Sequence, residues 1–297
     1  MTHGRHQTMR RDLRREIAGT IGLLTDEQDF TAMRRRYRTF GYDDHATYLQ
    51  QVEGLLRTLA SQGGHTTVAL FDPEEYAEYC AEHGLAPDTA SSRTRFTAEL
   101  ATTGATVPYE GQPLDALVPH LVDEAVRRAT WEYANTLLTR IGRCASCGED
   151  IGRAAFVRAY ELLVRVLEVS GPGERHLVCS VSTEPEALVA VLRTDDDHGT
   201  PRLDESEAME FTTVLAAGIA TRSAGGLVMR TSTSHTTDRV YGWRLRGEAL
   251  EPLTAGEVFD AYCTDAESGD LVSPEPGVDY CAPPDLGDDG HTTAHTH

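Results

Sequence analysis

A pair of cysteines between two long amphipathic segments constrains the fold of this chain more than any other feature. Residues 114–140 and 149–169 each repeat apolar side chains at the spacing of an α-helix, and Cys144-Ala145-Ser146-Cys147-Gly148 lies between them. A short connection between two helices favours an antiparallel hairpin, which would carry both thiols at its tip. Pro119 interrupts the first segment, which predicts a kink or two abutting helices.

The pattern Cys-x-x-Cys-Gly resembles the knuckle of zinc ribbons and rubredoxin-like sites, where the glycine frees the turn and backbone N–H groups point at the thiolates. The resemblance covers five residues. A structural zinc takes four ligands in a tetrahedron, and the chain contains no second Cys-x-x-Cys. Cys144 and Cys147 are therefore candidate ligands of a zinc whose other ligands lie elsewhere in the sequence.

The candidates for the remaining ligands are His176, Cys179, Cys263 and Cys281. A helix over residues 149–169 would be about 30 Å long, at 1.5 Å per residue, so the next segment starts far from the knuckle. A returning strand gains about 3.3 Å per residue, which brings Cys179 back to nearly the level of the knuckle and leaves His176 short of it. The two side chains would also point to opposite faces of that strand. We therefore predict that Cys144, Cys147 and Cys179 share one zinc, with the fourth ligand open.

Two other interpretations of these cysteines stay open. In the first, the pair consists of reduced thiols in a loop, and Cys179 packs as a small apolar residue. In the second, Cys144 and Cys147 form a redox pair, although thioredoxin-like pairs follow a strand and here a predicted helix precedes them. The sequence has no export signal and no apolar run near the roughly 20 residues that span a bilayer. We expect a cytosolic location, where the six cysteines are reduced or metal-bound.

The chain contains no lysine, since its 27 Lys and Arg residues are all arginine. A P-loop nucleotide site needs a lysine on the phosphates, and a PLP enzyme needs the lysine amine for its Schiff base. The composition therefore excludes PLP and a P-loop nucleotide, and it leaves structural zinc as the candidate cofactor. The net charge of −20 opposes nonspecific contact with nucleic acid or with an anionic membrane.

Charge is distributed unevenly along the chain. Residues 1–40 carry nine arginines and five acids, whereas the remaining residues carry 18 arginines and 42 acids. The run Arg34-Arg35-Arg36-Tyr37-Arg38 could contact a phosphate backbone, but such a run is more often the solvated face of a helix.

Apolar periodicity and the helix start and stop signals divide the chain into elements. Helices are predicted at 8–24, 26–38, 43–61, 73–84, 89–102, 114–140, 149–169, 204–221 and 254–263. Strands are predicted at 65–71, 105–108, 175–182, 187–194, 227–233 and 238–246. The predicted class is mixed α/β (α+β): a helix-rich N-terminal region with a small α/β unit, a central helical hairpin, and a C-terminal α+β region of two β-hairpins and two helices.

These elements group into four regions. Residues 1–62 form a helical region with a basic arm, and residues 63–142 form a small α/β unit and the long helix. Residues 143–264 hold the cysteine knuckle, a helix and a ββαββα region. Residues 265–297 form an acidic tail, for which we expect little regular structure.

No complete catalytic motif is present, since the sequence lacks Gly-x-Ser-x-Gly, His-Glu-x-x-His and a dinucleotide fingerprint. The first hypothesis is a cytosolic, non-catalytic binding or regulatory protein with a structural zinc knuckle and a protein partner. The alternative is a zinc- or thiol-dependent enzyme that uses Cys144, Cys147 or Cys179. The third is a nucleic-acid-binding module at the arginine-rich N-terminus. Nucleic acid and membrane are not the expected partners.

Overall fold

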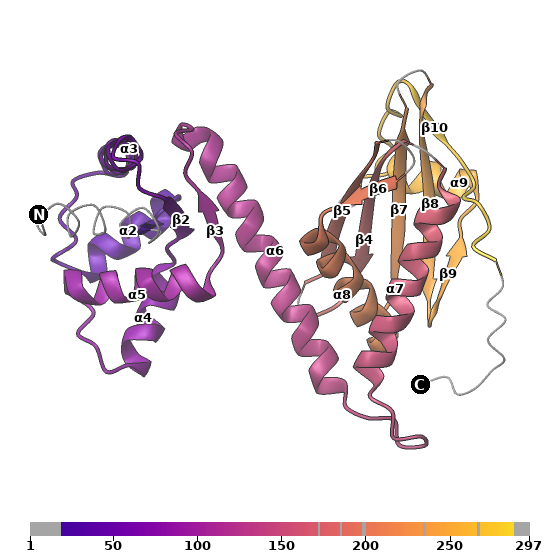
Figure 1. Ribbon diagram of the computed structural model, residues 1–297, viewed down its shortest axis with the longest axis horizontal. Coiled ribbons are helices and arrows are strands. Elements are labelled where there is room, and N and C mark those ends of the chain that lie inside the picture. The colour runs from indigo at the N-terminus through magenta and orange to yellow at the C-terminus, as the bar shows by residue number, and fades with distance from the viewer. Residues whose placement is uncertain are drawn as a thin grey trace, which may run out of the picture. The chain divides into compact units, whose positions relative to one another are not determined.

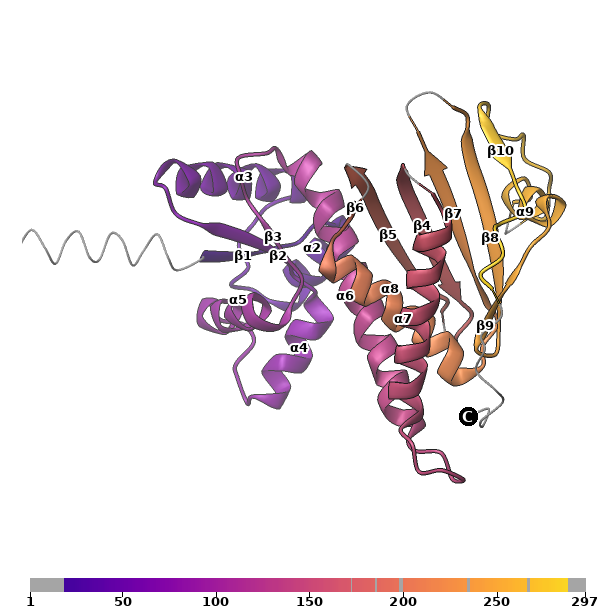
Figure 2. The same cartoon turned by 45° about the vertical axis from the view of Figure 1, so that its right-hand side comes forward.

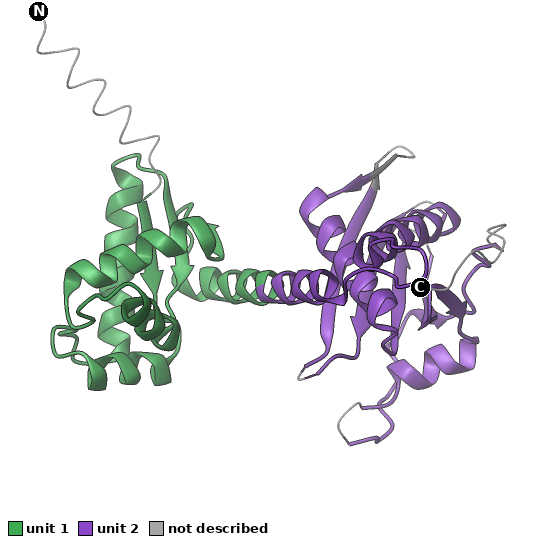
Figure 3. Ribbon diagram, turned by 90° about the horizontal axis from the view of Figure 1, so that it is seen from below, with its two compact units in different colours: residues 1–128 green, residues 129–297 purple. Residues whose placement is uncertain are grey.

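The structure is a computed structural model, and it describes residues 19–171, 173–184, 186–197, 200–233, 236–265 and 268–287. The chain divides into two compact units, residues 1–128 and residues 129–297 (Figure 3). The described residues of each unit surround a separate apolar core. Helices and strands occur in both units, which confirms the predicted mixed α+β class.

Unit 1 is a three-stranded sheet between helices (Figures 1 and 2). Its strands are β1 (Gly19–Leu23), β2 (Thr66–Leu70) and β3 (Thr106–Pro108). β2 lies in the centre, with β1 parallel to it and β3 antiparallel to it. The helices are α2 (Glu27–Arg36), α3 (His45–Ser61), α4 (Pro73–Glu82) and α5 (Ala90–Thr103). A further helix, α6 (Leu114–Ile141), begins in unit 1 and continues into unit 2.

β1 lies where the end of a helix over residues 8–24 was predicted. That prediction is wrong for residues 19–23, and residues 8–18 lie outside the described residues. β1 pairs with β2 along its whole length, and Gly22 permits close packing there, because a Cβ on it would lie 2.8 Å from Cδ2 of Phe71. A short apolar segment fits either a helix or a buried strand by periodicity alone, and pairing with β2 decides between them.

Aromatic rings make up much of the unit 1 core. Phe71, Tyr76 and Phe96 contact one another, with ring centroids 5.3 Å, 5.1 Å and 5.5 Å apart. Tyr48 packs against Phe30 at 5.6 Å, and burial raises the pKa of its phenol to about 12. Such large rings fill the space around a small sheet with few side chains.

Unit 2 is built on a seven-stranded sheet, in which β9 and β10 both pair with β8. Its strands are β4 (Glu174–Val181), β5 (Leu188–Asp197), β6 (Thr200–Leu203), β7 (Gly225–Ser232), β8 (Asp238–Arg246), β9 (Ala249–Pro252) and β10 (Val278–Tyr280). Its helices besides α6 are α7 (Ile151–Val169), α8 (Glu205–Thr221) and α9 (Ala255–Tyr262). The predicted order hairpin, helix, hairpin, helix is confirmed. The strands β6, β9 and β10 were not predicted, and β10 lies in the acidic stretch for which little regular structure was expected.

The central helical hairpin consists of α6 and α7 (Figures 1 and 2). α6 is one continuous helix that contains Pro119 in its second turn, not two abutting helices. Near the end of the hairpin the two helices touch, because a Cβ on Gly152 would lie 2.6 Å from the carbonyl oxygen of Leu138. None of the helices in the described residues combines the length and apolar character that a membrane-spanning segment needs.

Helices α7 and α8 cover one face of the unit 2 sheet, which we name the inner face (Figures 1 and 2). Along β4, buried residues alternate with more exposed ones, so Leu177, Cys179 and Val181 point into the core and Val178 points away. α8 approaches the strands closely, since a Cβ on Gly218 would lie 2.8 Å from Cγ2 of Val181. The inner face is therefore packed with small and aliphatic side chains.

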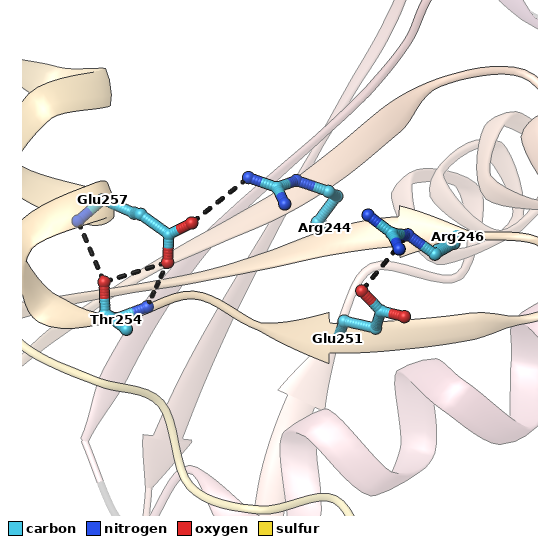
Figure 4. A network of polar contacts seen from close by, with 5 residues as sticks. All are labelled: Arg244, Arg246, Glu251, Thr254 and Glu257. Atoms are coloured by element: carbon cyan, nitrogen blue, oxygen red, sulfur yellow. Dashed lines mark hydrogen bonds and ion pairs between the residues drawn. The ribbon is translucent and has the colours of Figure 1, made fainter.

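The opposite, outer face carries α9, which packs over β8 (Figure 2). Val240 is fully buried there, and a Cβ on Gly242 would lie 3.2 Å from Cγ2 of Val258. The predicted capping box at the start of α9 is confirmed: the Glu257 N–H donates to Oγ1 of Thr254, and the Thr254 N–H donates to the Glu257 carboxylate (Figure 4). The capping box thus sets the residue at which α9 begins on the outer face.

Candidate functional site

The two cysteines of the predicted knuckle lie in a tight turn between α6 and α7, from Arg143 to Asp150, which we name the cysteine turn (Figure 1). Arg143 and Asp150 pair as an isolated β-bridge. The Cys144 N–H donates to the Glu149 carbonyl at 2.8 Å, and the Gly148 N–H donates to the Cys144 carbonyl at 2.8 Å. Gly148 has a φ of 75°, a left-handed conformation that glycine adopts without strain.

Both thiols of the cysteine turn reach the surface. Cys147 is exposed, and Cys144 is half-buried, with its Sγ 3.0 Å from Oγ of Ser146. Arg143 precedes the pair, and Arg153 follows it in the first turn of α7. The thiolate is the form of cysteine that binds metal.

Cys179 has a different environment. It lies on the inner face of β4 between Leu177 and Val181, and none of its surface is exposed. Burial raises the pKa of the Cys179 thiol to about 12, so the group stays protonated at neutral pH, which is its unreactive form. This is the environment of a small apolar core residue, one of the interpretations that the sequence left open.

Among the residues that the structure describes, no three His, Cys, Asp or Glu side chains form a group that could hold a metal ion. The cysteine turn brings Cys144 and Cys147 together, and Cys179 does not join them in such a group. A zinc shared by the three cysteines stays a prediction. The other candidate ligands are dispersed: buried Cys263 at the end of α9, half-buried Cys281 after β10, and His176 on the outer face.

A second candidate site lies on the outer face of the unit 2 sheet. His176 of β4 is directly opposite Arg193 of β5 on one side and Arg230 of β7 on the other. These three side chains form a line across three strands, which we name the cationic row. Directly opposite residues have Cβ atoms about 4.5–5.5 Å apart, and like charges at that spacing destabilise a sheet. Because the pKa of His176 is lowered, the two arginines and not the imidazole carry the positive charge of the row near neutral pH.

The charges around His176, at the centre of the cationic row, disfavour its protonated form, although Glu207 opposes them. Burial lowers the pKa of His176, and the charges of Arg193 and Arg230 lower it further. Arg230 is held by two acids: its Nε donates to Asp238 at 2.7 Å, and its two terminal nitrogens donate to the two carboxylate oxygens of Glu275 at 3.0 Å and 3.0 Å. Arg230, at one end of the row, thus already binds the carboxylates of Asp238 and Glu275.

The cationic row borders a hollow of about 470 Å³. The buried Arg175 and the exposed Arg202 of β6 also line this hollow, together with the acids Glu174 and Asp195. Basic groups outnumber acids in the lining, so the hollow favours an anion.

The part of the outer face next to the cationic row is aliphatic. Val178 of β4 is directly opposite Val191 of β5 and Val228 of β7, and all three are half-buried. Val189, one step further along β5, is 47% exposed. The outer face therefore carries basic and aliphatic side chains next to one another.

The arginines of β8 on the same face are neutralised within the chain (Figure 4). Arg244 pairs with Glu257 of α9 at 3.3 Å, and Arg246 pairs with Glu251 of β9 at 3.3 Å. Within the described part of the chain, Arg193 is exposed and forms no ion pair of this kind. Arg193 therefore differs from Arg244 and Arg246, because no ion pair within the described residues neutralises its charge.

The arginine-rich segment 34–38 binds acceptors of its own unit. Arg34 donates to the carbonyl of Asp43, and Arg36 pairs with Glu74. Both lie in the last turn of α2, where cations stabilise the helix dipole. Arg34 and Arg36 thus have a structural role, and residues 1–18 lie outside the described residues.

The cationic row was not predicted from the sequence. Its members come from three strands, and only the register of β4 with β5 and β7 brings them side by side. The alternation along each strand signals that His176, Arg193 and Arg230 face solvent, but not that they are neighbours.

A family model described as a domain of unknown function (DUF8829) matches residues 8–112. Within the described residues, this range covers unit 1 from β1 to the loop before α6 and leaves all of unit 2 outside. No curated protein and no solved structure matches the chain at a significant level. The two candidate sites described above both lie in unit 2, beyond the matched range.

Proposed function

We propose that this protein is a non-catalytic, cytosolic binding protein whose outer face in unit 2 holds an acidic segment of a protein partner. The observation that carries the proposal is the cationic row, in which His176 lies between Arg193 and Arg230. A carboxylate bound over the row would accept hydrogen bonds from the exposed Arg193, since arginine contacts carboxylates with paired hydrogen bonds.

The contact of Glu275 with Arg230 supports a carboxylate as the recognised group. Both oxygens of Glu275 accept from the guanidinium at 3.0 Å, which is the geometry that a partner's Asp or Glu would reproduce on Arg193. The neighbouring valines, with Val178 at their centre, support a peptide over a free inorganic anion. Aliphatic side chains of a peptide would bury apolar surface there, at roughly 25 cal/mol per Å².

Fluorescence anisotropy with two synthetic ten-residue peptides tests this function at about 0.15 M salt. One peptide alternates Glu with Val and the other alternates Lys with Val. We expect the full-length protein to bind the Glu peptide and not the Lys peptide. The substitution Arg193→Glu is expected to weaken binding of the Glu peptide by about tenfold or more, which corresponds to about 1.4 kcal/mol.

A matched control is Arg95→Glu, which makes the same charge change at an exposed position of α5 in unit 1. We expect this variant to bind the Glu peptide as the unmodified protein does. Equal affinity of the Arg193→Glu variant and the unmodified protein would contradict the proposal, and so would equal binding of the two peptides.

A further inference from the structure

We propose that the cysteine turn is one half of a zinc site, and that the cysteine turn of a second copy of this chain completes it. Each copy supplies Cys144 and Cys147, so four thiolates surround one zinc at Zn–S distances of about 2.3 Å. This inference does not rest on the proposed binding function, because the two concern different residues of unit 2.

The backbone of the cysteine turn holds the two thiols in a preformed loop. Hydrogen bonds fix it at both ends: the Ile151 N–H donates to the Gly142 carbonyl at 3.1 Å, and the Cys144 N–H donates to the Glu149 carbonyl at 2.8 Å. Gly142 has a φ of 80°, which lets the chain leave α6 and turn at once. Ligands that are held in place before the metal arrives lose little conformational freedom when they bind it.

The described part of one chain does not complete this site. It contains no group of three metal-ligating side chains, although a tetrahedral zinc needs four ligands. The third ligand expected from the sequence, Cys179, is fully buried on the inner face of β4. A thiol must lose its proton to bind zinc, and the burial that raises the pKa of Cys179 to about 12 opposes that loss.

A second copy can reach the cysteine turn. The turn forms the projecting end of the α6–α7 hairpin, beyond the strands of the unit 2 sheet, and Cys147 is exposed there (Figures 1 and 2). Two identical turns that meet about a two-fold axis contribute the same residues from each side, so the contact closes as a dimer.

The local charges suit a four-thiolate zinc, which carries a net charge of −2 when all four ligands are thiolates. Arg140 and Arg143 precede each pair of thiols and Arg153 follows it, so the three arginines outnumber the two acids of the turn, Glu149 and Asp150. The N-terminus of α7 adds its positive dipole end at Asp150. Two copies bring both sets of positive charge to one centre.

Zinc titration of the metal-free, full-length protein tests the proposal, with a phosphine reductant present so that no disulfide forms. Native mass spectrometry and light scattering give the mass and the metal content. We expect one zinc for every two chains, a doubling of the metal-free mass, and reversal by a chelator. Cobalt in place of zinc is expected to give the intense thiolate-to-metal charge-transfer bands of a four-thiolate site.

The variant C144S/C147S is expected to keep its fold, because the turn is at the surface, and to lose the zinc-dependent doubling. The matched control is C281S, which removes a half-buried thiol outside the turn and is expected to retain the doubling. One zinc per chain with no change of mass would overturn the proposal, because the site would then be completed within one chain. Zinc-dependent doubling that persists in C144S/C147S would also overturn it and would assign the metal to other ligands, such as the histidines of residues 288–297.

Discussion

The sheets of the two units differ in how many of their faces are buried. In β2 of unit 1, the consecutive residues Val68 and Ala69 point to opposite faces, and both have an exposed fraction of 0%. In β4 of unit 2, Leu177 is fully buried, whereas its neighbour Val178 is only half-buried. Unit 1 therefore uses its sheet as a buried layer, while unit 2 leaves much of one face of its sheet exposed. The exposed outer face of the unit 2 sheet is therefore the surface on which we expect binding.

The largest expected effects test this difference directly. Leu177→Ala is expected to lower the free energy of unfolding of unit 2 by about 2–5 kcal/mol, because it opens a cavity in the core. Val178→Ala, one residue along, is expected to cost less than about 1 kcal/mol. In unit 1, Val68→Ala is expected to cost about 1.5–3 kcal/mol, and Ala69→Val about 1–3 kcal/mol from overpacking, because both faces of β2 are filled.

Urea denaturation measures these costs. The tryptophan fluorescence reports on unit 2, since Trp131 and Trp243 both lie in it, and circular dichroism follows the whole chain. Equal losses from Leu177→Ala and Val178→Ala would show that both faces of β4 are packed, and the comparison with β2 would fail.

A second expected effect compares two glycines inside helices. Gly152→Ala in α7 is expected to destabilise unit 2 by about 1–3 kcal/mol, because the new Cβ would lie 2.6 Å from the carbonyl oxygen of Leu138. Gly54→Ala in α3 meets nothing within 4 Å and is expected to stabilise unit 1 by about 0.5–1 kcal/mol through helix propensity. The midpoints of urea unfolding give both values, and stabilisation by Gly152→Ala would refute the close contact between α6 and α7.

Local signals in the sequence predicted much of this fold. Asp72 and Pro73 mark the start of α4, where the Asp72 side chain accepts from the N–H groups of Glu74 and Glu75. Such signals act within a few residues, so no tertiary context is needed to interpret them. β1 was predicted as helix because its apolar pattern is short, and the contact that makes it a strand is β2, some 40 residues away in the chain. The wrong prediction therefore concerns a strand, β1, whose structure depends on pairing with a segment far away in the sequence.

The candidate sites divide in the same way. The cysteine turn was predicted, because two thiols, a glycine and two flanking helices are all local. Helix and strand lengths predicted that Cys179 returns to nearly the level of the cysteine turn, but length arguments do not state which face of the sheet a residue occupies. The pattern Leu177, Cys179, Val181 carried that information, since three apolar residues at alternate positions mark a core face. The cationic row needed the register of three strands, which no local signal provides.

The smallest expected effect concerns His176 and the open face of unit 2. Burial lowers its pKa, Arg193 and Arg230 lower it further, and Glu207 opposes them. An unfolded histidine has a pKa near 6.5, so below about pH 6.5 the unfolded chain binds more protons than the folded chain does at this position. The contribution of His176 to stability is therefore present above about pH 6.5 and is lost as the pH falls through the lowered pKa of the folded state.

Urea unfolding followed by tryptophan fluorescence between about pH 5 and 8 measures this loss, and His176→Gln is expected to flatten it. His120→Gln, at an exposed position of α6 in unit 1, is the control that leaves it unchanged.

A bound acidic peptide favours the protonated imidazole of His176, so the Glu/Val peptide is expected to bind more tightly as the pH falls. This gain in affinity should disappear in His176→Gln. The contrary result is a stability that rises as the pH falls and loses this rise in His176→Gln. It would mean that acids, and not arginines, dominate the charge around His176. The outer face of unit 2 would then be no more suited to an acidic partner than the buried sheet of unit 1.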